Sequence, residues 1–277
     1  MLHASCCVFH DDMTSMPSIK ELRAICQTSE ASPSLMSQSI MGKFNRVFSI
    51  YLTWIFIRLP FTPNQITVFG TVVYLLGAGL FLKYQFAWNL AGVLLIVLSF
   101  LIDAVDGELA RYRKMVAGGG VGGVYVEPVS HDVQYGWVFL PIAMGSFWET
   151  GSVWPLVAGF AATTSKLLFR LLEFRYNVLL RFWAERKGET YGLVPAPQTT
   201  PKTLQYFVFR NFFTGTGLTT MLLIAVLVRR VDFFLYFYGA SFFGLWLLLL
   251  GKQWMKIQRK LKEEHHAPTP VTHRTQT

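Results

Sequence analysis

The feature of this sequence that most restricts its fold is a series of long apolar stretches that contain almost no charge. A helix that crosses a bilayer needs about 20 mostly apolar residues. Because lipid offers no hydrogen bonds, the backbone of each crossing segment must satisfy itself as a helix. Six such stretches are predicted, at 66–82, 87–102, 133–147, 153–168, 212–228 and 233–250, and the third becomes long enough if its helix begins near Val124. We therefore expect an all-α polytopic membrane protein with six transmembrane helices.

The composition agrees with this fold class. Of the 277 residues, 52% are hydrophobic and 15% are charged, and the net charge is +9. A soluble domain carries about 25% charged residues, so a disordered chain and a soluble nucleic-acid binder are both disfavoured. The three cysteines, Cys6, Cys7 and Cys26, all precede the apolar body. Neither a disulfide framework nor a zinc site is therefore expected.

The segment before the first span has a different pattern. Apolar residues recur at helical spacing over 41–59, with Lys43, Arg46 and Arg58 among them. This favours an amphipathic helix on the membrane surface, with its cations toward anionic headgroups; the alternative is a first transmembrane helix. Residues 1–40 are polar, and we expect a disordered cytosolic extension there. The membrane domain then covers 41–259, and 260–277 is expected to be a flexible cytosolic tail.

The cations are distributed unequally between the two ends of the predicted spans. If the N-terminus lies in the cytosol, the opposite side carries only Lys83, Arg229 and Arg230. Lys and Arg accumulate in cytoplasmic loops. Both termini, and the end of the second span near residue 103, are therefore predicted to face the cytosol.

An acidic cluster stands at that end of the second span. Asp103 and Asp106 are three residues apart, so both carboxylates share one helix face. Such a pair suits a hard cation such as Mg²⁺, Mn²⁺ or Ca²⁺. Gly107 and Ala110 leave that face open to a ligand, and Arg111 suits a phosphate group. Ionisable residues at a membrane helix end are candidates for function by default.

The start of the third span supplies a second set. Gly123, Glu127 and His131 follow at four-residue intervals and form one stripe of a helix. Glu127 could complete the carboxylate cluster, and His131 is the natural proton acceptor near neutral pH. Asp132 either orients His131 or faces elsewhere. Pro128 requires this helix to begin nearby or to bend.

Three cations lie at helical spacing at the cytosolic end of the fourth span: Lys166, Arg170 and Arg175. One interpretation is that they extend to lipid headgroups. The other is that they form an anion-binding pocket for a phosphate-bearing acceptor.

The motif Asp-x-x-Asp-Gly-x-x-Ala-Arg at 103–111, followed by the helix that carries Gly123 and Glu127, resembles the signature of the CDP-alcohol phosphatidyltransferase family. Pro63-Asn64 and Thr67 also resemble the entry to that family's first span. The resemblance covers 41–259. It implies a six-helix membrane enzyme with a surface helix, often a homodimer.

The resemblance also implies residue roles. Asp103, Asp106 and Glu127 would bind two divalent ions, Mg²⁺ or Mn²⁺, with Asp106 central to catalysis. Gly107, Ala110 and Arg111 would accommodate the CDP group, with Gly123 on the facing helix. The residue at the fourth acidic position would deprotonate the acceptor alcohol.

The second half of the motif departs from the family pattern. Eleven residues separate Arg111 from Gly123, which is a longer gap than usual. Glu127 replaces the third aspartate and keeps a carboxylate. His131 replaces the fourth, so the base is either this imidazole or the neighbouring Asp132.

The expected function is transfer of a phosphatidyl or phospho-alcohol group to an acceptor hydroxyl with release of CMP. The donor is either CDP-diacylglycerol with a polar or phosphate-bearing alcohol acceptor, or a soluble CDP-alcohol with a lipid acceptor. The alternative is a non-catalytic or transport protein whose acidic cluster binds a cation. A transporter would place those carboxylates near the bilayer midplane, whereas here they fall at a span's end.

Overall fold

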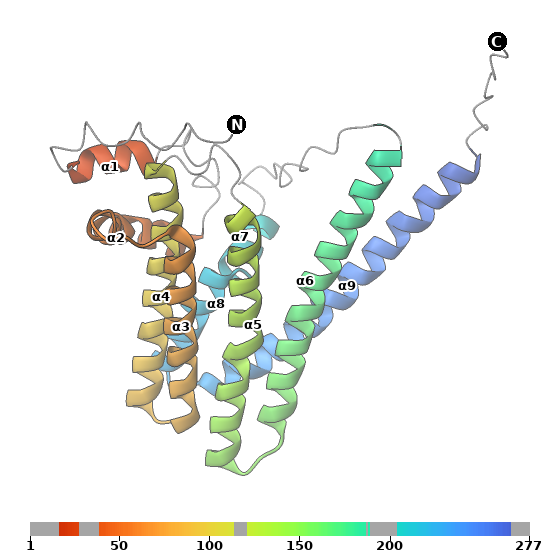
Figure 1. The fold of residues 1–277 in the computed structure, drawn as a ribbon. Coiled ribbons are helices and arrows are strands. Elements are labelled where there is room, and N and C mark those ends of the chain that lie inside the picture. The colour runs from red at the N-terminus through yellow and green to blue at the C-terminus, as the bar shows by residue number, and fades with distance from the viewer. Residues whose placement is uncertain (1–16, 28–38, 114–120, 187, 189–203, 267–277) are drawn as a thin grey trace.

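A computed structural model describes residues 17–27, 39–113, 121–186, 188 and 204–266 of the chain (Figure 1). This described part is helical and contains no strand. Its α-helices are α1 (Ile19–Cys26), α2 (Ile40–Phe56), α3 (Pro63–Leu80), α4 (Phe86–Tyr112), α5 (Val121–Thr150), α6 (Trp154–Arg186), α7 (Leu204–Phe212), α8 (Gly215–Leu227) and α9 (Val231–His266). One short 3₁₀ helix, Phe81–Lys83, joins α3 to the turn before α4.

Four of these helices are long and apolar enough to cross a membrane: α3 with its 3₁₀ extension, α4, α6 and α9. Of the six predicted stretches, the second, third and sixth lie within α4, α5 and α9, and the first lies within α3 and its 3₁₀ extension. The fourth begins one residue before α6, and the stretch 212–228 is divided between the end of α7 and α8. However, α8 has only 13 residues, and α5 carries ionisable residues in its first turns and is not among the four. An all-helical membrane protein is therefore confirmed, whereas the number of six spans remains a prediction.

Close packing between α3 and α4 sets the frame for the site. The start of α3 is defined by Thr62, whose hydroxyl caps Gln65 N, and by Pro63 in the first turn. Further along, a Cβ atom on Gly77 would lie 2.7 Å from the carbonyl oxygen of Gly92. Small residues allow such close approach between membrane helices. The two helices therefore run side by side in close contact (Figure 1).

The helix α2 buries its polar face and exposes its apolar face, which is the reverse of a surface helix in a soluble protein. Its polar residues Asn45, Ser49 and Thr53 are buried against the bundle, while Phe44 and Phe48 are exposed. An exposed apolar face is typical of a helix that lies in the membrane interface. The helix runs across the end of the α3–α4 pair (Figure 1). Its position at a membrane surface remains a prediction.

Two parts of the chain differ from the boundaries that we expected. Within the predicted disordered extension 1–40, residues 19–26 form α1, whose Leu22 and Cys26 are fully buried. Apolar residues at positions 19, 22 and 26 explain this, because they face α2 and α4 together. At the other end, α9 continues to His266, beyond the boundary that we placed after residue 259.

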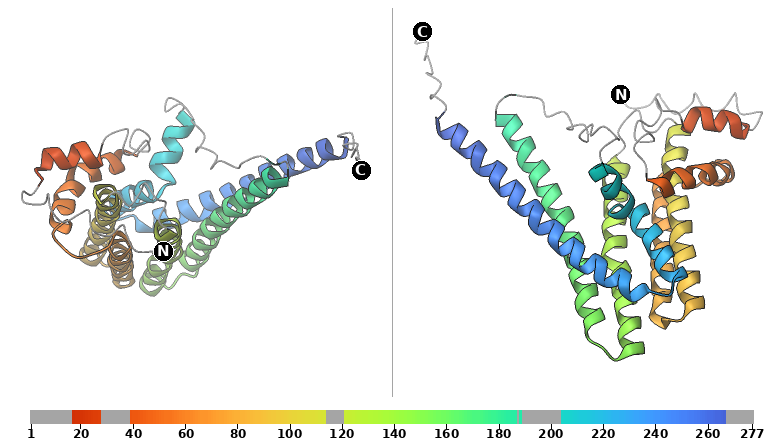
Figure 2. Two further views of the ribbon diagram at one scale, coloured as in Figure 1. Left: turned by 45° about the horizontal axis from the view of Figure 1, so that its top comes forward. Right: turned by 180° about the vertical axis from the view of Figure 1, so that it is seen from behind.

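The long helices α6 and α9 contact each other and run obliquely away from the α1–α5 group (Figures 1 and 2). The main apolar core lies between α3, α4, α5, α6, α8 and α9. Phe139, Leu218, Phe234 and Tyr238 are among its buried members. The helices α1, α2 and α7 gather at one end of the bundle. That end also contains the C-terminal turns of α4, which carry the acidic motif.

Candidate active site

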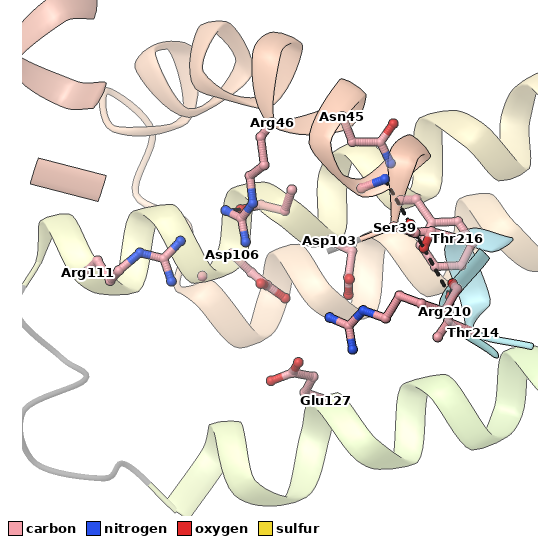
Figure 3. Close-up of a pocket in the computed structure, with 14 residues that line it drawn as sticks. Ser39, Asn45, Arg46, Asp103, Asp106, Arg111, Glu127, Arg210, Thr214 and Thr216 are labelled. Carbon is pink, nitrogen blue, oxygen red and sulfur yellow. Dashed lines mark hydrogen bonds between the residues drawn. The ribbon is translucent and has the colours of Figure 1, made fainter. Parts of the chain in front are cut away.

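A pocket of about 410 Å³ opens at this end of the bundle, between α2, α4, α5 and the α7–α8 junction (Figure 3). Its lining combines carboxylates, guanidinium groups and hydroxyls. The residues that line it are Ser39, Gly42, Asn45, Arg46, Phe100, Asp103, Ala104, Asp106, Gly107, Arg111, Glu127, Arg210, Thr214 and Thr216.

The three predicted carboxylates meet in this pocket. Asp103 and Asp106 point into it from α4, and Glu127 points toward them from α5 on the opposite wall (Figure 3). The Thr67 hydroxyl of α3 donates a hydrogen bond of 2.5 Å to Oδ2 of Asp106. This contact places Thr67, part of the entry motif of α3, directly behind the acidic motif of α4.

Three arginines surround these carboxylates. Arg111 comes from the motif itself, and its Nε donates to the backbone oxygen of Cys26 at 2.8 Å. Arg46 comes from α2 and Arg210 from α7, and both side chains extend into the pocket (Figure 3). We expected Arg46 to face lipid headgroups, and this is wrong because its guanidinium pairs with the buried carboxylate of Glu108 at 3.0 Å.

Glu108 organises the wall behind the pocket. Its side chain is completely buried, and it accepts hydrogen bonds from Ser49 Oγ at 2.7 Å and from Thr53 Oγ1 at 2.5 Å. With the bond from Arg46, this one carboxylate ties α4 to three residues of α2. Sequence reasoning missed its role, although the i, i+3, i+7 spacing of Arg46, Ser49 and Thr53 on one helix face was a signal.

The two candidate bases lie in different surroundings. Nε2 of His131 is 3.9 Å from Oδ1 of Asp103, and its Nδ1 is 3.3 Å from Oε1 of Gln134. Asp132 instead forms an ion pair with Arg170. Neither residue lines the pocket itself. The structure therefore brings His131 beside the acidic cluster and directs Asp132 toward α6.

The three cations of the fourth span do not reach the pocket. Lys166 is buried, and its ammonium donates to the Phe213 backbone oxygen at 3.1 Å and lies 4.5 Å from the Tyr135 ring centroid. Arg170 lines a separate cavity of about 500 Å³ between α5 and α6. Arg175 is exposed and lines neither cavity. These three side chains therefore do not line one common pocket in the described part of the chain, and a role in acceptor binding stays a prediction.

The remaining predicted residues have mixed outcomes. Gly107 lines the pocket, and a Cβ atom there would lie 3.3 Å from Nη1 of Arg111. Ala110 is half-buried and is not among the lining residues. Gly123 lies in the first turn of α5, where only the course of the backbone is described.

The donor atoms in the pocket suit a hard divalent cation. Within the described part of the chain, no three acidic, His or Cys side chains are close enough together to hold a metal as they stand. Mg²⁺, however, keeps several waters and is usually bound by one or two carboxylates together with substrate phosphates. Asp103 and Asp106 on one wall and Glu127 on the other are consistent with that kind of site.

The fold and the pocket together define an integral membrane protein whose acidic and basic side chains meet at one end of a helical bundle. The chain belongs to the CDP-alcohol phosphatidyltransferase family, whose profile matches residues 60–246, more than half of its length. The match contains Asp103, Asp106, Glu127, His131 and Arg210, and it leaves out α1 and α2. A search of curated proteins finds no match. Membership makes the chain an enzyme of the CDP-alcohol phosphotransferase kind.

Proposed function

We propose that this protein transfers a phosphatidyl or phospho-alcohol group from a CDP-linked donor to an acceptor hydroxyl and releases CMP, with a divalent metal. The observation that carries the proposal is the shared pocket. Four residues of the family motif, Asp103, Asp106, Gly107 and Arg111, line it together with Glu127 from the facing helix.

The carboxylates would hold Mg²⁺ or Mn²⁺, with two ions expected from the family resemblance. When bound, such ions neutralise phosphate charge and stabilise the leaving group. Asp106 is supported in this role by the hydrogen bond from Thr67, which restricts the carboxylate to one orientation. Glu127 is exposed on its helix and approaches from the other wall.

The arginines would bind the phosphate groups of the donor. A guanidinium group presents parallel N–H donors that match phosphate oxygens. Arg46, Arg111 and Arg210 enter the pocket from three different helices, so they surround a ligand rather than line one side of it. Catalysis of phosphoryl transfer depends mainly on such positioning and charge stabilisation.

His131 would act as the general base. A hydrogen on Nδ1 directed to Gln134 leaves the Nε2 lone pair toward the acidic cluster. Nε2 would take the proton of the acceptor hydroxyl while that oxygen attacks phosphorus. The bond from phosphorus to the CMP oxygen then breaks, and CMP leaves with the electron pair. Asp132 is the weaker candidate because it pairs with Arg170. If this carboxylate took up a proton, it would become neutral and leave the Arg170 charge without its partner.

The active site is proposed to face the cytosol, as are both termini. Among the described residues, the helix ends on the pocket's side carry most of the Lys and Arg residues, and Lys83, Arg229 and Arg230 lie at the other end. This location suits a water-soluble acceptor or donor that meets its lipid partner at the membrane surface. A homodimer is also proposed, on the family resemblance alone.

The test is CMP release by purified protein in lipid nanodiscs with Mg²⁺ or Mn²⁺. Donors are CDP-diacylglycerol and soluble CDP-alcohols, each screened against polar alcohols, phosphate-bearing alcohols and diacylglycerol. Asp106→Asn should abolish release. Asp232→Asn, which changes an acid at the other end of the bundle, is the matched control and should be active. Wild-type rates in Asp106→Asn would contradict the proposal.

A further inference from the structure

The helix α1 lies outside the residues that match the family, yet its C-terminal end contacts two of the pocket's arginines. We propose that α1, through Gln27 and the Cys26 carbonyl, positions Arg46 and Arg111 to bind the phosphate groups of the CDP-linked donor. This inference rests on the proposed function, and it assigns a site contribution to a segment that the family pattern does not contain.

Apolar contacts hold α1 in place. Leu22 and Cys26 are completely buried and form a small cluster with Ile50 of α2. Trp54 of α2 donates from Nε1 to the Pro17 oxygen at 3.2 Å, and the Arg23 guanidinium donates to the Val47 oxygen at 3.1 Å. The helix is therefore anchored at both ends by α2.

Gln27 connects α1 to Arg46 in two ways. Its side-chain amide donates to the backbone oxygen of Arg46 and to Oε1 of Glu108, both at 2.8 Å. The same Oε1 atom accepts from the Arg46 guanidinium at 3.0 Å. One amide group thus contacts both the backbone of Arg46 and the carboxylate that orients its side chain.

The second connection runs from Cys26 to Arg111. The Cys26 carbonyl accepts from Nε of Arg111 at 2.8 Å. Cations are favoured at the C-terminal end of a helix, where the backbone carbonyls are unsatisfied. This bond uses the Nε edge of the guanidinium, while the buried Nη2 has no hydrogen-bond partner among the described residues. Arg111 is therefore held by α1 at one edge and lines the pocket with the rest.

A helix that only covered apolar surface would not need these polar contacts. Three hydrogen bonds of Cys26 and the C-cap residue Gln27 end on arginines that line the pocket or on the carboxylate behind them. A positioning role therefore predicts an effect on donor binding, whereas a covering role predicts an effect on stability alone.

The first experiment measures the affinity of CDP, used as the probe with Mg²⁺, by calorimetry on full-length protein. Gln27→Ala should weaken binding by about tenfold, equivalent to ~1.4 kcal/mol. The KM for the donor that supports CMP release should rise by a similar factor, with kcat and the acceptor KM nearly unchanged. Lys20→Ala, on the exposed face of α1, is the matched control and should match wild type.

A double-mutant cycle separates positioning from stability. If Gln27 acts through Arg46, Gln27→Ala added to Arg46→Ala should weaken CDP binding no further than Arg46→Ala alone. Additive effects of the two substitutions would overturn the proposed route, and so would unchanged CDP affinity in Gln27→Ala.

The third measurement needs no activity. With Cys6 and Cys7 replaced by serine, Cys26 is the only thiol in the chain. Its burial and the nearby Glu108 raise its pKa to about 11, so maleimide should modify it slowly. Leu22→Asp should undock α1, expose Cys26 and weaken CDP binding at least as much as Gln27→Ala. Rapid labelling of Cys26 in the protein that retains Leu22 would contradict docking of α1. An exposed Cys26 in Leu22→Asp with unchanged CDP affinity would contradict the positioning of the arginines by α1.

A wild-type protein that binds CDP but releases no CMP with any donor would instead count against the proposed function.

Discussion

Thr67 and Asp106 are joined by a hydrogen bond of 2.5 Å that runs from the first long apolar helix, α3, to the acidic motif of α4. The contact makes the orientation of a pocket carboxylate depend on a neighbouring helix. Thr67→Val keeps the side-chain shape and removes the donor, so we expect CMP release to fall by about tenfold, the effect of one hydrogen bond to a charged group. Thr67→Ser should retain most of the rate. Equal rates in all three proteins would show that this bond is unimportant.

The buried Glu108 should matter for stability. It accepts hydrogen bonds from Gln27, Arg46, Ser49 and Thr53 without any exposure to solvent. Glu108→Ala leaves the Arg46 charge and two hydroxyls without this acceptor, and we expect a loss of roughly 3–5 kcal/mol, as for a broken buried ion pair. The measurement is the thermal unfolding midpoint in detergent. Glu149→Ala, an exposed acid near the end of α5, should leave the midpoint unchanged.

The position of the base can be tested by comparing two neighbours. We expect His131→Ala to reduce kcat by about 10²–10⁴-fold, the usual contribution of a general base. Asp132→Ala should cost much less, because this carboxylate pairs with Arg170 rather than approaching Asp103. The opposite order of effects would move the base to Asp132.

Arg210 should contribute to substrate binding although it lies about a hundred residues after the motif in the sequence. Its side chain enters the pocket near Asp103 and Glu127 (Figure 3). Arg210→Ala should raise the KM of a phosphate-bearing substrate by roughly ten- to a hundredfold, as expected for charged hydrogen bonds of about 1.5–3 kcal/mol. Arg210→Lys should recover part of this loss. The exposed Arg230 pairs loosely with Asp232 at the other end, and Arg230→Ala serves as the control.

The Cys26 thiol gives a pH-dependent measure of α1 docking. Its pKa is raised from 9.0 to about 11, first by burial and then by Glu108, while Arg111, Arg46 and the backbone of Tyr112 act in the opposite direction. Because the docked state favours the neutral thiol, its contribution to docking is complete below pH 9 and is lost as the pH rises toward 11. In the protein without Cys6 and Cys7, the iodoacetamide rate should therefore have its midpoint near pH 11. Leu22→Asp should lower that midpoint toward 9. Identical pH profiles with and without Leu22→Asp would contradict burial of the Cys26 thiol by docking of α1.

Much of the fold follows from local pattern. The apolar stretches predict where helices lie, because a backbone in lipid has no partner except its own segment. The acidic motif is equally local, since Asp103 and Asp106 share a helix face whatever surrounds them. The four-residue spacing along α5 likewise places Glu127 and His131 on one helix face, and packing then brings Glu127 into the same pocket as the motif on α4. The inferences about shared helix faces need only the helical repeat and the chemistry of carboxylates.

Other features depend on contacts between distant segments. Nothing in the local sequence distinguishes Arg46 and Arg210, which line the pocket, from Arg175, which is exposed. Lys166 belongs to a run of cations, yet packing directs its ammonium to the Phe213 carbonyl. The short α1 lacks a long apolar stretch, and it is stable because Leu22 and Cys26 meet a surface that α2 and α4 form together.

The sequence alone thus indicated the membrane class of this protein, its family and the carboxylates that line its pocket. Each of these features depends on residues that are close together along the chain. Only the tertiary structure decided which cations join those carboxylates, that Glu108 is buried behind them, and that α1 contacts the site. The physical reason is that a buried ion pair or hydrogen bond forms only where packing brings its two partners together away from water.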